Sequence, residues 1–239
     1  MRLRATTLLA AAFLFLAPAA SRAALAPYTQ NFESLNAADP NVLCAEGWNA
    51  YVNIFGPPHV FFYGYGFCAP NGGNAACAVV NGQGGPLQAV QQMSVYSNYD
   101  DNQHANGNFV EMNVYREQMI GPGDAGKTVY FQFDSKHGNW TGGSTTAGAF
   151  IKTLNPAAGY ATTNFVLTDL TAIPQSWGTY SVSFTIDPGL VGQLLQFGFM
   201  DTATHYDPTV LFYDNILFAP DIATPSKSKS WGSLKMQYR

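Results

Sequence analysis

The sequence predicts an all-β domain in which two antiparallel sheets pack face to face as a sandwich. Apolar residues recur at every second position in short runs, Gly, Pro, Asn and Asp separate these runs, and helical periodicity is confined to two short windows. The windows 87–93 and 190–195 are each expected to form a short helical turn. Eight runs fit strands, a number typical of two packed sheets, and they cover 61–67, 109–115, 128–134, 147–153, 162–168, 179–186, 194–200 and 210–218.

The predicted strands have two different faces, because alternate side chains of a strand point to opposite sides. The apolar face predicts a core between two sheets, with Val110, Met112, Val114, Val129, Phe131, Phe133, Val182, Phe184, Ile186, Leu195, Phe197 and Phe199. The opposite face mixes aromatic rings, amides and carboxylates, and we interpret it as a ligand surface. A plain exposed sheet face is the alternative, since strands favour aromatic residues in any case. This mixed polar and aromatic face contains Glu111, Asn113, Tyr115, Tyr130, Gln132, Asp134 and Gln196.

The composition excludes several classes of protein. Of the 239 residues only 11% are charged, whereas 14% are aromatic, 23 are Gly and 14 are Pro. A coiled coil or a helix bundle needs far more charged and helix-forming residues. Residues 24–220 contain four basic and 14 acidic side chains. No basic patch is present to neutralise phosphates, so we expect no nucleic-acid partner.

The two ends of the chain differ from its body. Residues 1–23 combine Arg2 and Arg4 with an apolar run and a small-residue cleavage site, which is typical of a secretory signal peptide. We therefore expect secretion, to the periplasm or the cell exterior, of a mature chain that begins near Ala24. The apolar run is too short to span a membrane. Residues 24–220 are predicted to form the sandwich domain and residues 221–239 a flexible basic tail.

The three cysteines leave the disulfide pairing open. Cys68 and Cys77 flank a short Gly- and Asn-rich loop and are the predicted pair. The alternative is a disulfide between Cys44 and either of these two. In each case one cysteine remains unpaired.

Two end segments resemble a known fold. Residues 28–33 (Tyr-Thr-Gln-Asn-Phe-Glu) and 212–218 (Phe-Tyr-Asp-Asn-Ile-Leu-Phe) are similar to the first and last strands of the galactose-binding-like jelly roll found in carbohydrate-binding modules of families four and nine. The resemblance implies a jelly-roll β-sandwich. It also implies a structural calcium ion (Ca²⁺) held by Glu33 and Asp214, because hard oxygen ligands suit this metal. The alternative role of both carboxylates is to accept backbone hydrogen bonds at strand ends.

Sugar binding requires flat apolar rings for stacking and polar groups for the hydroxyls. We therefore expect a monomer that binds a polysaccharide without cleaving it. Trp48 and Phe61 are instead expected to pack in the core or under loops. The predicted ligand-binding residues are Tyr63, Tyr65, Glu111, Asn113, Tyr115, Tyr130, Gln132, Asp134 and Trp140.

Two other functions fit the sequence. A polysaccharide-cleaving enzyme, either a lyase or a glycoside hydrolase, would use Glu111, Tyr130 and Asp134. Glu111 and Asp134 would serve as acid and base if neighbouring strands bring their carboxyl groups to within about 5 to 9 Å. The third class is a surface or matrix protein that binds another protein.

Overall fold

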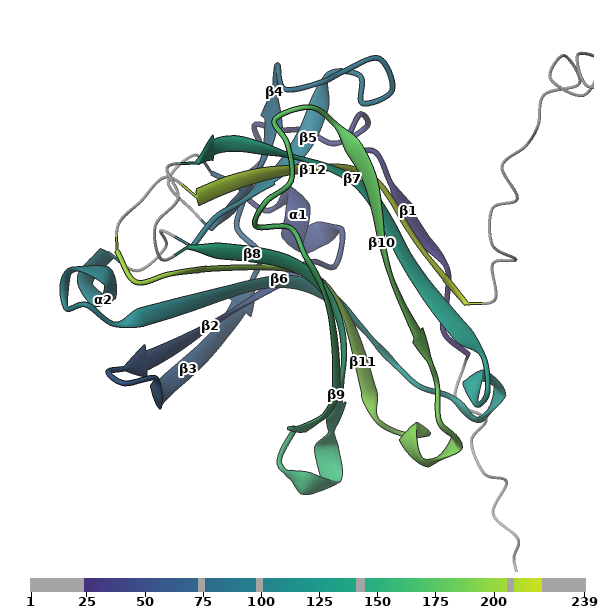
Figure 1. Cartoon of the computed structure of the whole chain (residues 1–239). Helices are drawn as coiled ribbons and strands as arrows, with labels where there is room; N and C mark the ends of the chain where they lie inside the picture. Colours follow the sequence, from purple (N-terminus) through teal and green to yellow (C-terminus); the bar gives the residue numbers. More distant parts are fainter. Residues whose placement is uncertain (1–23, 73–75, 98–100, 141–144, 206–208, 221–239) are drawn as a thin grey trace, which may run out of the picture.

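A computed structural model describes residues 24–72, 76–97, 101–140, 145–205 and 209–220. The signal peptide and the basic tail predicted from the sequence lie outside these residues. The described chain forms two antiparallel sheets that pack as a jelly-roll sandwich (Figure 1), which confirms the predicted fold class. Among the described residues, no helix is long and apolar enough to cross a membrane.

The first sheet has the strand order β10-β7-β12-β5-β4, and β1 pairs with the later part of β12. Its strands are β1 (Tyr28–Gln30), β4 (Cys77–Asn81), β5 (Gln91–Val95), β7 (Thr128–Trp140), β10 (Gly178–Thr185) and β12 (Thr209–Pro220).

The second sheet has the order β3-β2-β6-β11-β8-β9. Its strands are β2 (Asn49–Gly56), β3 (Val60–Cys68), β6 (Phe109–Met119), β8 (Thr146–Asn155), β9 (Ala161–Asp169) and β11 (Leu194–Ala203). Short helices lie between strands: α1 (Val42–Ala45), α2 (Asp101–Ala105), and the 3-10 turns η1 (Pro122–Asp124), η2 (Pro156–Ala158) and η3 (Pro188–Leu190).

Each of the eight predicted runs corresponds to a strand, although the run 179–186 extends one residue beyond β10, and the predicted apolar faces form the core. Aromatic rings from the two sheets meet there: the Phe131 and Phe197 ring centroids are 5.2 Å apart, and Phe199 stacks on Tyr213 at 3.6 Å. Two expectations were wrong. Residues 91–93, the end of the window 87–93, belong instead to strand β5 (Gln91–Val95), because this segment pairs with β4 and β12. Phe61, expected to be packed, is 56% exposed on the edge strand β3.

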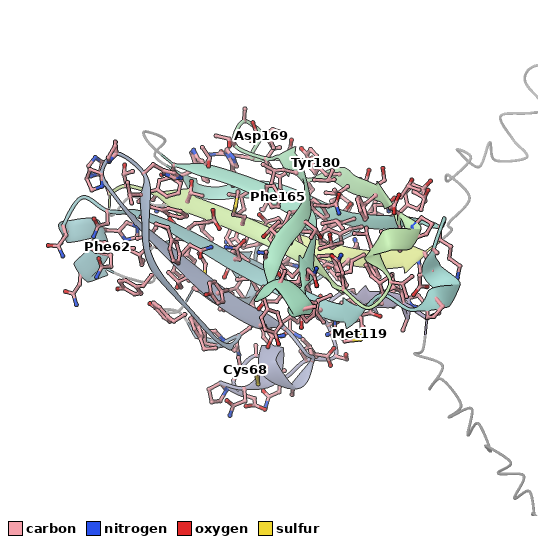
Figure 2. All side chains as sticks on the ribbon, turned by 90° about the horizontal axis from the view of Figure 1, so that it is seen from below. Phe62, Cys68, Met119, Phe165, Asp169 and Tyr180 are labelled. Atoms are coloured by element: carbon pink, nitrogen blue, oxygen red, sulfur yellow. A yellow bond between two sulfur atoms is a disulfide. The ribbon has the colours of Figure 1, made fainter. Side chains whose placement is uncertain are left out.

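The predicted Cys68–Cys77 disulfide was also wrong. Cys68 is bonded to Cys44, and their Cα atoms are 5.2 Å apart. The physical reason is the direction of the side chains. Cys77 points from β4 into the core, where it is fully buried, whereas Cys68 ends β3 at the periphery beside α1, which carries Cys44 (Figure 2). Burial also raises the pKa of the Cys77 thiol.

Loss of the Cys44–Cys68 disulfide should destabilise the fold. The bond closes a loop with a sequence separation of 24, and the chain entropy of such a loop corresponds to about 3 kcal/mol. We expect the double variant Cys44→Ser with Cys68→Ser to lose roughly this amount of unfolding free energy in urea denaturation. The wild type should expose one alkylatable thiol only on unfolding. An unchanged stability, or two reactive thiols without reductant, would contradict this pairing.

Candidate functional site

The outer face of the second sheet is hollow. In Figure 1, β2 and β3 run toward the lower left, and β8 and β9 turn downward in the centre with β11 to their right. A groove of about 430 Å³ lies on this face, lined by residues of β2, β6, β8, β11 and β9 and by Gly159 and Tyr160, which follow the η2 turn. Seen from below in Figure 2, Phe165 of β9 lies near the middle of the molecule, and Phe62 and Met119 lie toward opposite ends.

Tyr51 supplies a flat ring on the β2 side of the groove. Its neighbours on β3 are Gly64 and Gly66, which have no side chains to hold the ring away. A Cβ added to Gly64 would lie 2.7 Å from Tyr51 Cε1, and one added to Gly66 would lie 2.9 Å from Tyr51 Cδ2. The tyrosine ring therefore rests directly on the β3 backbone, and it lines the groove.

Glu111 is held in place by two amides. Its Oε1 accepts hydrogen bonds from Nδ2 of Asn53 and Nδ2 of Asn113, both at 2.8 Å. Asn53 lies directly opposite Glu111 in the pairing of β2 with β6, and Asn113 follows two residues later on the same face. The sheet itself therefore fixes this carboxylate, as expected for two residues that the sequence placed on one face.

Glu117, Gln196 and Lys152 form a row across β6, β11 and β8, since each lies opposite the next in register. Gln196 Nε2 donates to Glu117 Oε2 at 2.6 Å. Gln196 is only 4% exposed, yet its Oε1 has no hydrogen-bond partner in the described part of the chain. A buried acceptor without a donor is costly, and the Gln196 side chain is part of the groove lining.

Lys152 places a cation beside this row. Its Nζ lies 5.0 Å from the ring centroid of Phe150 and 5.8 Å from that of Tyr115. Within the described ranges, no carboxylate lies within 4.0 Å of Nζ. Burial lowers the pKa of Lys152, and the charges of Glu111 and Glu117 offset part of that effect. The lysine thus brings hydrogen-bond donors to the groove.

Tyr115 completes the groove with a second ring. Burial, followed by the nearby charge of Glu117, raises its pKa to about 12. A phenol with a raised pKa is a poor general base near neutral pH. Its hydroxyl therefore acts in this groove as a neutral hydrogen-bonding group.

The structure separates the predicted ligand-binding residues into three places. Glu111, Asn113 and Tyr115 share the outer face of the second sheet. Tyr63 and Tyr65 lie on the opposite face of β3, because they pair with the buried residues Ile54 and Val52. Tyr63 is 41% exposed and stacks on Tyr65.

Tyr130, Gln132 and Asp134 lie on the other sheet, on β7. Gln132 lines a wide hollow there, between β1 and the end of β12, that contains no aromatic side chain. Trp140 ends β7 and stacks on His137, with ring centroids 4.5 Å apart. The shared face proposed for Glu111 and Asp134 was therefore wrong. The alternation of side chains assigns the face of one strand, but it does not say which of two sheets a strand joins.

Asp134 anchors neighbouring chain segments. Its Oδ1 accepts from the Thr179 hydroxyl at 2.6 Å, and its Oδ2 accepts from Gln88 Nε2 at 2.7 Å and Asn215 Nδ2 at 2.8 Å. With Glu111 on the outer face of the opposite sheet, the core separates the two carboxylates. They cannot act together as the predicted acid and base.

Glu117 in the groove and Glu111 beside it on the same face are also too far apart for glycoside hydrolysis. Glu111 and Glu117 are six residues apart on β6, a rise of about 20 Å at 3.3 Å per residue. Glycosidases need carboxyl groups within about 5 to 9.5 Å of each other. Glu111 is moreover bound to two asparagines, so it is not free to lean toward Glu117.

The arrangement around Glu33 does not fit a calcium ion. Glu33 Oε1 accepts the backbone N–H groups of Val90 at 2.8 Å and Gln91 at 2.6 Å. The amide Nε2 of Gln91 lies 3.0 to 3.1 Å from the carbonyl oxygens of Phe32, Glu33 and Leu35. An amide nitrogen thus occupies the point on which these oxygens converge, where a cation would need to sit.

Asp214 is likewise engaged by a hydrogen-bond donor, because its Oδ1 accepts Asn215 N at 2.6 Å. In the described part of the chain, no group of three or more His, Cys, Asp or Glu side chains could hold a metal ion together. Both carboxylates therefore accept hydrogen bonds from backbone N–H groups, which is the alternative role considered for them.

Several groove residues were missing from the predicted ligand-binding set, among them Glu117, Lys152 and Tyr160. The first two lay within reach of sequence reasoning, because Glu117 continues the alternation of β6 beyond the predicted run 109–115 and Lys152 lies within the predicted run 147–153. Tyr51 was also omitted, since β2 was not among the predicted strands although Ala50, Val52 and Ile54 alternate with polar residues. Tyr160 follows η2 with a positive φ of 64° and carries no strand signal.

Comparison with known proteins gave matches among solved structures. No protein-family model and no curated protein sequence matches the chain. The enzymatically active domain of tailspike protein 4 from bacteriophage CBA120 is 11% identical, with 61% of this chain and 18% of that chain covered and a TM-score of 0.40. Carbohydrate-binding modules are also among the similar structures.

Several of these modules belong to family 22. The N-terminal part of the Clostridium thermocellum endo-1,4-β-D-xylanase 10B, with its family 22 module, is 13% identical over 82% of this chain and 28% of that chain, with a TM-score of 0.41. A xylan-binding family 22 domain from Paenibacillus barcinonensis is 13% identical over 81% of this chain and 99% of that domain, with a TM-score of 0.43. The chain thus spans less than a third of the tailspike and xylanase chains.

Proposed function

We propose that the protein binds a neutral polysaccharide chain in the groove of the second sheet without cleaving it. The observation that carries this proposal is the Tyr51 ring, which rests on Gly64 and Gly66 in the same groove as the polar side chains of Gln196 and Lys152. The ring offers an apolar surface for a pyranose, and the Lys152 ammonium offers hydrogen-bond donors for the sugar hydroxyls.

The charges in the groove favour a neutral ligand. Glu117 and Lys152 line the groove as one acidic and one basic group, Glu111 lies beside it on the same face, and residues 24–220 carry an excess of acidic groups. A densely charged acidic polysaccharide would be repelled by this balance. The separation of Glu111 from Glu117 and the raised pKa of Tyr115 argue for binding rather than for hydrolysis or base-catalysed elimination.

Native affinity electrophoresis tests this function directly. The protein is run through gels cast with neutral and acidic polysaccharides, and each gel is then stained for the polymer. We expect retardation by at least one neutral polysaccharide over an intact stained background. A cleared zone behind the band would overturn the proposal in favour of an enzyme. Migration unchanged by every glycan would overturn it in favour of a protein-binding role.

Tyr51→Ala should abolish this retardation, because it removes the stacking surface. The matched control is Tyr130→Ala, which removes a tyrosine from the outer face of the other sheet and should leave the retardation unchanged. Equal loss in both variants would place binding elsewhere, and retention in Tyr51→Ala would show that this ring does not carry it.

Gly64→Ala should weaken polysaccharide binding by displacing the Tyr51 ring without removing it. The added methyl group would meet the ring at 2.7 Å and lift it from β3. We expect binding about tenfold weaker, equivalent to about 1.4 kcal/mol, by isothermal titration calorimetry with the polysaccharide found above. Gly123→Ala, whose Cβ would meet no atom within 4 Å, is the control. Unaltered affinity in Gly64→Ala would contradict the flat-ring arrangement.

We further propose that the protein is secreted. The Cys44–Cys68 disulfide supports this, since disulfides persist in oxidising compartments. Expression of the full chain with mass spectrometry of the exported product should give a chain that begins near Ala24. Retention of residues 1–23 on a cytoplasmic product would contradict secretion.

A further inference from the structure

An aromatic cluster lies at the tip of the hairpin formed by β2 and β3. The His59 ring is parallel to that of Phe55, with centroids 4.4 Å apart. Phe109 meets both rings edge-on, at 4.6 Å from His59 and 5.7 Å from Phe55. Phe61 also meets Phe55 edge-on, at 5.7 Å. We call these four residues, Phe55, His59, Phe61 and Phe109, the hairpin cluster.

The hairpin cluster lies on the same face of the second sheet as the groove. Tyr51, Asn53 and Phe55 alternate along β2, and the first two line the groove. Phe55 is therefore the next residue of that face beyond the groove. On β6, Phe109 lies opposite Phe55, just as Glu111 lies opposite Asn53. The face that contains the groove thus continues along β2 and β6 as far as the hairpin tip.

The turn at the end of the hairpin holds the imidazole over Phe55. Residues 56–59 form a tight turn, closed by a hydrogen bond that His59 N donates to Gly56 O at 2.8 Å. His59 has a positive φ of 92°, a costly conformation for a residue with a side chain, and such residues cluster at binding sites. Phe55 covers one face of the imidazole, and His59 is exposed. The cluster therefore presents an aromatic ring to the solvent.

The hairpin tip exposes an unusually apolar surface. Four consecutive residues of β3, from Val60 to Tyr63, are between 41% and 68% exposed. Edge strands commonly carry charged residues that keep other molecules away. Residues 47–99, however, contain no Asp, Glu, Lys or Arg. A contiguous exposed apolar surface indicates an interaction site, and the lack of charge favours an uncharged partner.

The spacing of the rings along β2 fits a long ligand. Four residues separate Tyr51 from Phe55, a rise of about 13 Å at 3.3 Å per residue. Between these two levels, Asn53 and Glu111 supply an amide and a carboxylate from neighbouring strands. Two stacking surfaces with hydrogen-bonding groups between them suit a chain of several sugars. A single sugar would reach only one of the two surfaces.

We propose that the hairpin cluster is a second stacking subsite for the neutral polysaccharide, which lies along β2 and β6 from Tyr51 to His59. This inference rests on the proposed function and adds a requirement for ligand length. Only a chain that extends past Asn53 contacts the cluster, so the subsite selects long ligands over short ones.

Isothermal titration calorimetry with oligosaccharides of increasing length tests the subsite. The probes are the di- to hexasaccharides of the neutral polysaccharide that retards the wild type, taken from the cello-, xylo- or manno-series. We expect the hexasaccharide to bind more than tenfold more tightly than the disaccharide. The double variant His59→Asn with Phe61→Ala should lose most of this gain and keep the affinity for the shortest oligosaccharide that binds. Asparagine tolerates a positive φ, so the turn is preserved.

Tyr63→Ala is the matched control for the double variant. Tyr63 is exposed on the same strand, but its side chain lies on the opposite face of β3. Its removal should leave the affinity for the hexasaccharide unchanged. Tyr51→Ala should instead weaken the binding of every length, because all the oligosaccharides share the groove.

Nuclear magnetic resonance of the wild type gives a second measurement, which does not depend on the fold of a variant. The imidazole signals of His59 are assigned by their loss in His59→Asn. They should shift when the hexasaccharide is added and stay in place with the shortest oligosaccharide that binds. This readout separates direct contact at His59 from an indirect effect of the substitutions on the hairpin.

Four results would overturn the subsite and leave the groove as the glycan site. The first is a hexasaccharide that binds no more tightly than the disaccharide. The second is equal affinity of the wild type and the double variant, with His59 signals that do not respond, which would mean that the cluster only stabilises the hairpin. The third is an equal loss of affinity in Tyr63→Ala. The fourth is a wild-type dimer that dissociates in the double variant on size-exclusion chromatography, which would assign the apolar surface to a second copy of the chain.

Failure of the proposed function looks different from these four results. In that case no polysaccharide retards the wild type, and both the groove and the hairpin cluster lose their role in glycan binding.

Discussion

Trp48→Ala is expected to lower the free energy of unfolding by about 3 to 5 kcal/mol, the range for removal of a large buried aromatic side chain. Trp48 is fully buried between the sheets. Its ring lies nearly parallel to that of Phe199, at 6.2 Å, and meets Tyr28 of the opposite sheet edge-on at 6.1 Å. Its Nε1 also donates to the Tyr28 hydroxyl at 3.1 Å. The variant therefore loses packing and a hydrogen bond across the sandwich.

Urea denaturation followed by circular dichroism measures this loss. Trp177→Ala is the matched control, because Trp177 is only partly buried and donates its Nε1 to the Gln83 carbonyl of a loop. Its effect should be clearly smaller. Equal losses in the two variants would show that the contact between Trp48, Phe199 and Tyr28 is not a main source of stability.

Asp214 should make the protein less stable as the pH rises from about 4 to about 7. Burial, together with the charges of Glu33 and Asp134, raises its pKa from 3.8 to about 7, against the opposing effect of hydrogen bonds from Asn215 and Gln92. The folded state thus holds this proton more tightly than the unfolded state does. The stabilisation is complete below pH 4 and is lost as the pH passes the folded pKa.

The size of this effect is on the order of 4 kcal/mol, at 1.36 kcal/mol for each pH unit. We expect Asp214→Asn to be clearly more stable than the wild type at pH 8.5 and to differ little from it at pH 4.5. Urea denaturation at the two pH values gives both differences. Equal differences in unfolding free energy between wild type and variant at the two pH values would mean that the carboxyl group of Asp214 does not titrate between them.

The sequence predicted the faces of the strands well, because burial imposes a period of two on each strand separately. Val110 and Phe131 were assigned to the core for this reason, and both are fully buried. The pairing of strands into sheets depends on contacts between distant residues, which no local period records. Glu111 and Asp134 were therefore placed on one face although they belong to different sheets.

Short buried strands were the elements that the sequence did not reveal. Strand β5 contains Gln92 and Ser94, which are polar but buried, so no alternation marks it. The disulfide was missed for a related reason: Cys44 meets Cys68 only because α1 packs at the end of β3. The Tyr51 site depends on glycines of a neighbouring strand, and a glycine carries no hydrophobic signal.

The contact between Tyr51 and the β3 backbone has a consequence for how tightly a ligand can be held. A tyrosine on an open surface exchanges between rotamers and loses that freedom when it binds, which weakens the complex. The Tyr51 ring rests on main-chain atoms, so its orientation is set before any ligand arrives. Complex formation then costs little conformational entropy at this residue. Sequence variation at neighbouring side chains should alter specificity more readily than it alters the plane of the ring.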